Sequence, residues 1–121
     1  MNTQSITGRR GEDIAVRYLR DNGFLIRDRN WRSGRYEIDI VAEKSGVVHI
    51  VEVKTRRAGA LAPPESAVTP SKCTAMRRAA EAYMAQRVVC GEAVLDLLAV
   101  DMFPDGSYDV RYIPNAVEIG W

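Results

Sequence analysis

The sequence contains a single histidine, His49, and two cysteines, Cys73 and Cys90, among its 121 residues. It has no CxxC spacing and no histidine cluster, which excludes the common zinc frameworks and a disulfide scaffold. We therefore expect both cysteines to be reduced packing residues. P-loop, nucleophile-elbow and HExxH motifs are also missing, so nucleotide-driven motors, serine hydrolases and zincins have no support.

Long apolar runs and a strong net charge are absent as well. No stretch approaches the length of a membrane-spanning helix, and the N-terminal segment lacks the apolar core of a signal peptide, so we expect a cytoplasmic protein. The formal net charge of +1 gives no overall basic field that would indicate nucleic acid. All basic residues except Lys44, Lys54 and Lys72 are arginines. Arginine suits bidentate phosphate contacts, but the same bias arises from a GC-rich genome.

The length fits one domain, residues 1–121, with 113–121 as a C-terminal tail. Periodicity and turn signals predict two helices, at about Ser5–Asn22 and Thr69–Arg87. They also predict strands at Phe24–Arg27, Tyr36–Glu43, Val47–Thr55, Ala93–Met102 and Tyr108–Ile113. A basic loop, DRNWRSGR, and a second loop at Arg57–Val68 complete the chain. This order predicts an α/β fold with three α/β/α layers, in which helices flank a central mixed sheet.

The most informative stretch is the predicted hairpin YEIDIVAEKSGVVHIVEVKTRR. Glu52 and Lys54 are two residues apart on one strand, so both project to the same face. Asp39 lies on the neighbouring strand, with Glu37 on its face as possible support. If the register places Asp39 across from Glu52, acids and a lysine converge among apolar residues, where unpaired charges are unfavourable.

A divalent cation between the carboxylates would explain this convergence. Mg²⁺ prefers oxygen ligands, typically one or two carboxylates completed by water and phosphate oxygens. Such an ion polarises a phosphodiester and activates water, and a neighbouring lysine stabilises the developing charge. Glu12 supports the same site, because helical spacing places it on the stripe of Ala15, Val16 and Leu19 that should face the sheet.

Simpler explanations exist for each of these residues. Glu52 and Lys54 could form a cross-strand ion pair at a sheet edge, which contributes little. Glu12 could be an acid that favours the helix N-terminus. His49 lies on the opposite parity from Glu52, so we expect it to be structural. Asp96 lies within an apolar strand and should support a nearby basic residue or backbone group.

Several segments together resemble one family. They are TGRRGE at Thr7–Glu12, NWR at Asn30–Arg32, EID at Glu37–Asp39, VEVKTR at Val51–Arg56, AVTPSK at Ala67–Lys72 and LDLLAV at Leu95–Val100. The sequence resembles the YraN-like family of predicted endonucleases, distantly related to archaeal Holliday junction resolvases, over nearly its whole length. Tyr36 is a departure, because a glycine usually precedes EID at this position.

The resemblance implies a restriction-endonuclease-like fold with a PD-(D/E)xK site. Asp39, Glu52 and Glu12 would be the metal ligands, and Lys54 the catalytic lysine. Mg²⁺, or Mn²⁺ in its place, would be the cofactor, with no organic or nucleotide cofactor and no membrane. The substrate would be DNA, branched or otherwise structured, in repair or recombination, and the resolvase-like relatives act as dimers.

Basic residues flank the proposed site along the chain and could neutralise DNA phosphates on either side of a scissile bond. They are Arg9, Arg10, Arg32, Arg35, Arg56, Arg57 and Lys72. A solvated charged surface is the alternative for each. Two rival functions also stay open at this point: a non-catalytic nucleic-acid-binding module of the same fold, and a protein-interaction domain in a repair assembly.

Overall fold

The computed structural model describes residues 6–59, 63, 66, 69–89 and 91–116. Two helices and five strands follow one another in the predicted order. The elements are α1 (Ile6–Asp21), β1 (Leu25–Ser33), β2 (Tyr36–Lys44), β3 (Val47–Arg57), α2 (Pro70–Gln86), β4 (Ala93–Met102) and β5 (Tyr108–Ile113).

All five strands belong to one sheet, and their order in space follows their order in the chain. β1, β2 and β3 form an antiparallel meander, β3 pairs with β4 in parallel, and β5 is antiparallel to β4. Since parallel neighbours need a long connection, α2 supplies the crossover between β3 and β4. The predicted mixed sheet is therefore confirmed.

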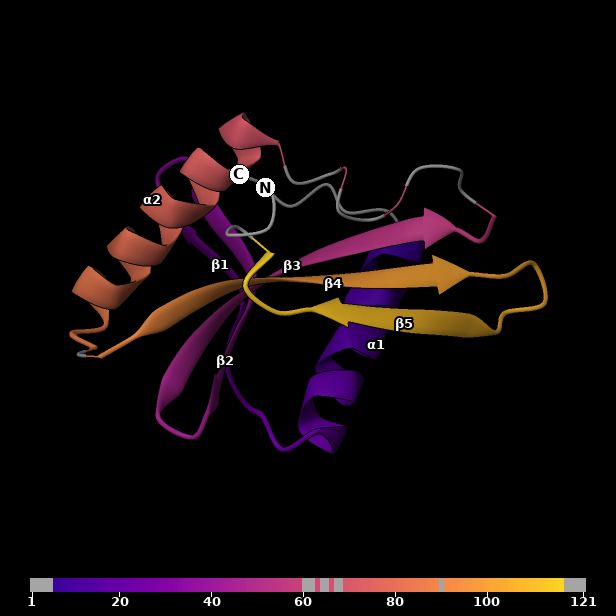
Figure 1. Ribbon diagram of the computed structural model, residues 1–121, viewed down its shortest axis with the longest axis horizontal. Coiled ribbons are helices and arrows are strands. Elements are labelled where there is room, and N and C mark those ends of the chain that lie inside the picture. Colours follow the sequence, from indigo (N-terminus) through magenta and orange to yellow (C-terminus); the bar gives the residue numbers. More distant parts are fainter. Residues whose placement is uncertain (1–5, 60–62, 64–65, 67–68, 90, 117–121) are drawn as a thin grey trace.

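The two helices cover opposite faces of the sheet (Figure 1). The stripe of α1 that includes Ala15, Val16 and Leu19 packs on Val51 and Leu98 of the central strands. On the other face, α2 packs against β1, β2 and the start of β3, with Tyr83 at the centre of the contact. The architecture is a three-layer α/β/α sandwich, as the sequence predicts.

Local signals set the ends of both helices. The side chain of Thr69 accepts a hydrogen bond from the Lys72 amide at 3.2 Å, and Pro70 occupies the first helical position, so α2 begins where predicted. At the end of α1, Gly23 adopts a φ of 86°, and its amide donates to the Arg20 carbonyl. These ends fix where each helix places its side chains over the sheet.

The prediction of a basic loop at DRNWRSGR is wrong for most of that segment. Asp28 to Ser33 continue β1, and only the turn at Gly34 and Arg35 separates this strand from β2. β1 is an edge strand, where charged side chains can point to solvent, so a polar sequence is compatible with strand structure. Trp31 is buried and packs edge-on against Tyr83, at a ring-centre distance of 5.3 Å.

β2 and β3 separate partway along their length. Their pairing runs from the turn, at Lys44 and Val47, to Ile40 and Val51, and then stops. Beyond this point β2 stays paired with β1, while β3 stays paired with β4 as far as Arg57. Figure 1 shows β1 and β2 turning away from β3, β4 and β5. The sheet thus opens in its middle, a feature that periodicity alone does not predict.

Cys73 is a free, buried cysteine, as expected, whereas Cys90 lies outside the described residues. The same holds for most of the predicted loop after Arg57 and for residues 117–121 of the tail; Ala116 is buried. No helix in the described part of the chain is both long and apolar enough to cross a membrane.

Gly11 brings α1 close to β3, and its replacement tests this contact. Alanine in a helix normally stabilises by about 1 kcal/mol relative to glycine. Here an added Cβ would lie 2.0 Å from Thr55 Oγ1, so we expect Gly11→Ala to lower the free energy of unfolding by about 1–3 kcal/mol. Urea denaturation measures this. Adding Thr55→Ala should restore most of the loss, and a Gly11→Ala protein as stable as the parent would contradict the close packing.

Candidate functional site

Asp39 and Glu52 stand where β2 and β3 part. Each is the residue next to the last paired position, Ile40 on β2 and Val51 on β3. Because the backbone ladder ends there, the Val53 amide has lost its strand partner, and it donates instead to Asp39 Oδ2 at 2.8 Å. The Asp39 side chain thus takes the place of a ladder hydrogen bond and is tied to β3 one residue from Glu52.

Two small cavities adjoin this point, between β3 and the first turns of α2. The first has a volume of about 160 Å³ and is lined by Glu52, Lys54 and Lys72, among others. The second, of about 200 Å³, is lined by Glu52 and Lys72 together with Arg35 and residues at the start of β2. Glu52 and Lys72 line both cavities, so they lie at the centre of the candidate site.

The surroundings of Asp39 disfavour the ionised form of its carboxyl group. Burial raises the pKa of Asp39 to about 7, and the negative charges of Glu52 and Glu12 act in the same direction. The Val53 amide and the charge of Lys72 lower the pKa of Asp39, but they do not outweigh the burial. The three predicted acids therefore interact electrostatically at one place, although they come from α1, β2 and β3.

The two lysines of the site differ in their contacts. Lys72 Nζ lies 2.6 Å from Glu52 Oε1. Burial of Lys72 lowers the pKa of its ammonium, but the hydrogen bond and charge of Glu52, with Asp39 and Glu37, outweigh burial, so the pKa of Lys72 is raised. Lys54 is exposed on the wall of the first cavity, and no acid of the described residues lies within ion-pair distance of it. Sequence reasoning assigned Lys72 only to DNA binding and missed this contact with Glu52.

Glu12 is almost completely buried, with 1% of its surface exposed, as its inward stripe predicts. The side-chain amide of Asn30 donates to Glu12 Oε1 at 2.7 Å, and Arg29 approaches the same oxygen at 3.4 Å. Arg29 also pairs with Asp13 at 2.6 Å. α1 begins at Ile6 and has no acid in its first turn, so Glu12 is not an acid of the helix N-terminus. The buried acid on α1 is instead linked to β1.

Asn30 has an unusual backbone for a strand residue, with a φ of 51°. The pairs on either side of it, Arg29 with Ile40 and Trp31 with Ile38, place it opposite Asp39. Asparagine tolerates this left-handed conformation better than most residues. The amino-acid sequence does not indicate that a residue in the middle of a strand has a positive φ. Asn30 was therefore not predicted to be a site residue.

The donor set fits a cation held by two carboxylates. Among the described residues, only the Val53 amide is hydrogen-bonded to Asp39, which leaves capacity on a carboxylate with about four acceptor positions. A hard cation completed by water and phosphate oxygens needs no more than two such carboxylates. Within the described ranges, no three His, Cys, Asp or Glu side chains form a group that could hold a metal ion. A direct role of Glu12 as ligand therefore stays a prediction.

The basic residues predicted to contact DNA have varied surroundings. Arg32 pairs with Glu37 at 3.0 Å, and Arg56 with Asp101 at 3.0 Å. Arg10 donates to the Gly106 carbonyl at 2.6 Å. The remaining four are exposed: Arg9, Arg35, Arg57 and Lys72. Arg35 and Lys72 line the second cavity, so they lie nearest to the acids.

His49 and Asp96 form a structural cluster away from these acids. Asp96, fully buried, accepts hydrogen bonds from the Asn115 amide at 3.0 Å and from the hydroxyl of Tyr112, and lies 2.6 Å from His49 Nδ1. Burial, and then the hydrogen bond with Asp96 and its charge, raise the pKa of the Tyr112 hydroxyl. The cluster ties β3, β4 and β5 together, which agrees with the supporting role predicted for Asp96.

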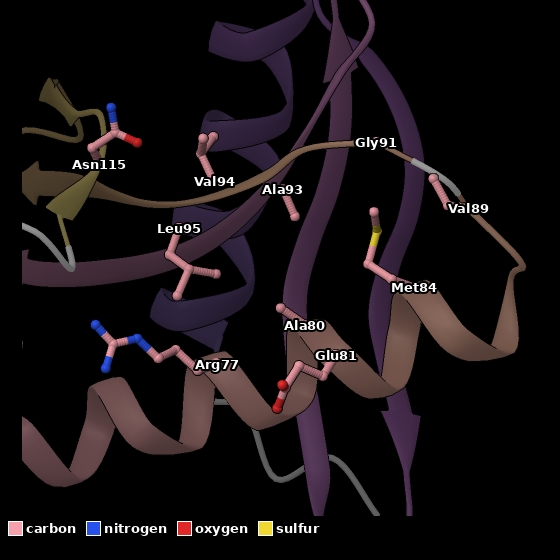
Figure 2. Close-up of a pocket in the computed structure, with 10 residues that line it drawn as sticks. All are labelled: Arg77, Ala80, Glu81, Met84, Val89, Gly91, Ala93, Val94, Leu95 and Asn115. Atoms are coloured by element: carbon pink, nitrogen blue, oxygen red, sulfur yellow. The ribbon is translucent and has the colours of Figure 1, made fainter.

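A larger cavity of about 610 Å³ lies between α2 and the start of β4. Figure 2 shows Met84 and Ala80 of α2 facing Ala93 and Leu95 across it. None of the predicted site residues lines this cavity. Arg77, Glu81 and Asn115 are its polar lining residues, and they include no pair of acids. We therefore place the candidate site at Asp39 and Glu52.

Asp39 gives the protein a specific pH dependence. Its pKa is raised from 3.8 to about 7 on folding, so the folded state holds the proton more tightly than the unfolded state. Stability from this group is complete below about pH 4 and is lost as the pH rises through 7. We expect Asp39→Asn, which keeps an acceptor for the Val53 amide, to be more stable than the parent at pH 8 by up to about 4 kcal/mol in metal-free buffer.

Thermal unfolding from pH 4.5 to pH 8.5 measures this difference. The advantage of Asp39→Asn should shrink towards pH 4.5. Parallel curves for the two proteins over this range would contradict the burial of a charged Asp39.

Asn30 allows its backbone and its side chain to be tested separately. Asn30→Gly keeps the left-handed conformation but removes the donor to Glu12, so we expect a loss of about 1–2 kcal/mol in unfolding free energy. Asn30→Ala adds the strain of a positive φ and should lose about 1 kcal/mol more. Urea denaturation compares the two variants. An alanine variant more stable than the glycine variant would show that the strand does not impose this conformation.

The family model and the similar proteins that match this chain all carry the same family designation. The sequence model of the uncharacterised protein family UPF0102 matches residues 11–101. A UPF0102 protein of Bacteroides thetaiotaomicron is 42% identical over 109 residues, which cover 90% of this chain and 89% of the relative. One from Persephonella marina is 38% identical over 117 residues, or 96% of this chain and 97% of the relative.

A UPF0102 protein of Porphyromonas gingivalis is 41% identical over 100 residues, which cover 83% of this chain and 74% of the relative. These relatives carry no more than the family designation in their names. The match with the family model includes Glu12, Asp39, Glu52, Lys54 and Lys72. The chain belongs to the uncharacterised protein family UPF0102.

Proposed function

We propose that the protein is a metal-dependent endonuclease that hydrolyses phosphodiester bonds in DNA, with a restriction-endonuclease-like fold. The observation that carries the proposal is the opening of the sheet at Asp39 and Glu52. Two acids from diverging strands lie there and interact electrostatically, and two lysines line the cavity beside Glu52. A purely structural ion pair would need one acid and one base and would not keep the second acid buried at a raised pKa.

Asp39 and Glu52 would hold Mg²⁺ or Mn²⁺ in this proposal. When bound, such an ion supplies Lewis-acid polarisation of the phosphodiester and lowers the pKa of an attacking water. The two strands hold the carboxylates on a rigid scaffold, so the carboxylates need little reorganisation for binding. Glu12, fixed by Asn30, adds negative potential from the α1 side and favours a cation further.

Lys54 would act on the phosphate side of the site. Its ammonium is exposed in the cavity wall, two residues from Glu52 on the same face of β3. From there it can donate to a phosphoryl oxygen as negative charge develops, or orient a water molecule for in-line attack. The exposed Arg9, Arg35 and Arg57 would neutralise neighbouring DNA phosphates and position the DNA strand.

The type of DNA comes from the resemblance to resolvase-like proteins. A branched or otherwise structured substrate, a role in repair and a cytoplasmic homodimer all rest on that resemblance and form part of the proposal. The open sheet edges at β1 and β5 are compatible with assembly between copies. Activity on a four-way junction would thus be the most specific form of the function.

Cleavage assays test the proposal. Labelled four-way junction, flap, single-stranded and linear duplex DNA would be incubated with Mg²⁺ or Mn²⁺. We expect metal-dependent cutting that Glu52→Gln and Lys54→Ala each reduce by at least about a hundredfold, because each removes a group at the reacting phosphate. Glu43→Gln is the matched control, since Glu43 is an acid near the other end of β2 that pairs with Arg27.

The outcomes separate the three functional readings. Full activity of Lys54→Ala would remove Lys54 from the mechanism. DNA binding without cutting of any substrate would favour a non-catalytic nucleic-acid-binding module. Absence of both binding and cutting would favour a protein-interaction domain and refute the proposal.

A further inference from the structure

We propose that Lys72 is an exchangeable cation of this site. It neutralises Glu52 in the metal-free protein, leaves Glu52 when a divalent cation binds, and then contacts a DNA phosphate. The inference rests on the proposed function, because it assumes that Asp39 and Glu52 bind a cation. In this proposal Lys72 couples the binding of the metal ion to the binding of DNA phosphate, which a lysine that only contacts phosphate would not do.

The contact with Glu52 defines the first state. Lys72 Nζ lies 2.6 Å from Glu52 Oε1, and Lys72 is the one basic side chain of the described residues within ion-pair distance of Glu52. Asp39 and Glu37 lie close enough to act on the same ammonium. Lys72 is therefore the positive charge that balances this acidic pair as long as no other cation is present.

The side chain is free to move while its backbone is fixed. The Lys72 amide donates to Thr69 Oγ1, and Pro70 starts the helix, so the Cα of Lys72 is held at the first turn of α2. The side chain of Lys72 is 45% exposed, compared with 23% for Glu52. A lysine stem has four rotatable bonds, so its ammonium can leave a fixed carboxylate without any change in the fold.

Competition for the Glu52 carboxylate defines the second state. A divalent cation held by the Glu52 carboxylate would repel the Lys72 ammonium, so binding of the cation would weaken the Lys72–Glu52 ion pair. Lys72 also lines both cavities beside the acids. A phosphate that enters either cavity is thus within reach of the released ammonium, whose charge then binds a phosphate oxygen.

This exchange makes the binding of metal and of phosphate mutually reinforcing. Each ligand removes an obstacle to the other: the metal frees Lys72 for the phosphate, and the phosphate draws Lys72 away from Glu52. Thermodynamic linkage requires the same coupling factor in both directions. A structural ion pair between Lys72 and Glu52 would have no such consequence.

Metal affinity in the absence of DNA gives the first test. Mn²⁺ binding to the full chain would be measured by electron paramagnetic resonance, with thermal stabilisation as a second readout. We expect Lys72→Met, which keeps an apolar stem, to bind Mn²⁺ about fivefold more tightly than the parent. Lys54→Met is the matched control, because it removes a lysine from the same cavity that forms no ion pair with Glu52.

Each result has a defined meaning. An increase in Mn²⁺ affinity that is clearly larger for Lys72→Met than for Lys54→Met supports the exchange. Equal gains would show a general field effect and overturn it, and unchanged or weaker binding by Lys72→Met would overturn it while leaving the metal site in place. No Mn²⁺ binding by the parent or either variant would overturn both this inference and the proposed function. Lys72→Gln provides a second neutral variant if Lys72→Met folds poorly.

The coupling itself gives the second test. Affinity for a short DNA duplex would be measured with and without Ca²⁺, a hard cation that also takes oxygen ligands. We expect Ca²⁺ to strengthen DNA binding by the parent and to do so by a factor about fivefold smaller in Lys72→Met. The same factor in both proteins would overturn the coupling even if Lys72→Met binds metal more tightly.

Discussion

The hydrogen bond from the Val53 amide to Asp39 is the interaction on which the candidate site depends. β2 and β3 pair as far as Ile40 and Val51 and then separate, because β2 follows β1 while β3 follows β4. The separation exposes a backbone donor that would be unfavourable without a partner, and the Asp39 carboxylate supplies one. It also opens space beside Glu52. A continuous ladder would have closed that space and left Asp39 and Glu52 as an ordinary cross-strand pair.

The remaining layers hold this opening in a fixed shape. Close packing of Gly11 on Thr55 keeps α1 near β3 and brings Glu12 to the sheet. The Asp96 cluster ties β3 to β4 and β5, so the half of the sheet that carries Glu52 and Lys54 behaves as a unit. On the other face, Thr69 and Pro70 fix the start of α2, and this places Lys72 within ion-pair distance of Glu52. The acids are thus kept together despite a repulsion that burial strengthens, an arrangement typical of functional sites.

Much of the fold followed from local sequence signals. Thr69 and Pro70 predicted the start of α2, Gly23 the end of α1, and the alternation from Tyr36 to Thr55 the central hairpin. The failure at DRNWRSGR has a physical cause: an edge strand with charged side chains has no apolar alternation, so it resembles a loop. Asp39, Glu52 and Lys54 stand out in the sequence because charged residues in an otherwise apolar strand are anomalous, and Glu12 because it lies on the apolar stripe of its helix. Their role as a metal site stays a prediction. The Lys72 contact, the backbone of Asn30 and the parting of the strands depend on tertiary structure, so no periodicity reports them.

In the proposed function, Asp39 and Glu52 form one divalent-cation site where β2 and β3 separate. Paramagnetic broadening of backbone amide signals by substoichiometric Mn²⁺ tests it most directly, because the effect falls steeply with distance from the ion. We expect the strongest broadening at Asp39, Glu52 and Val53, and loss of this pattern in Asp39→Asn. Broadening centred elsewhere, for example around Asp96 or the exposed Asp105, or a pattern unchanged by Asp39→Asn, would contradict it.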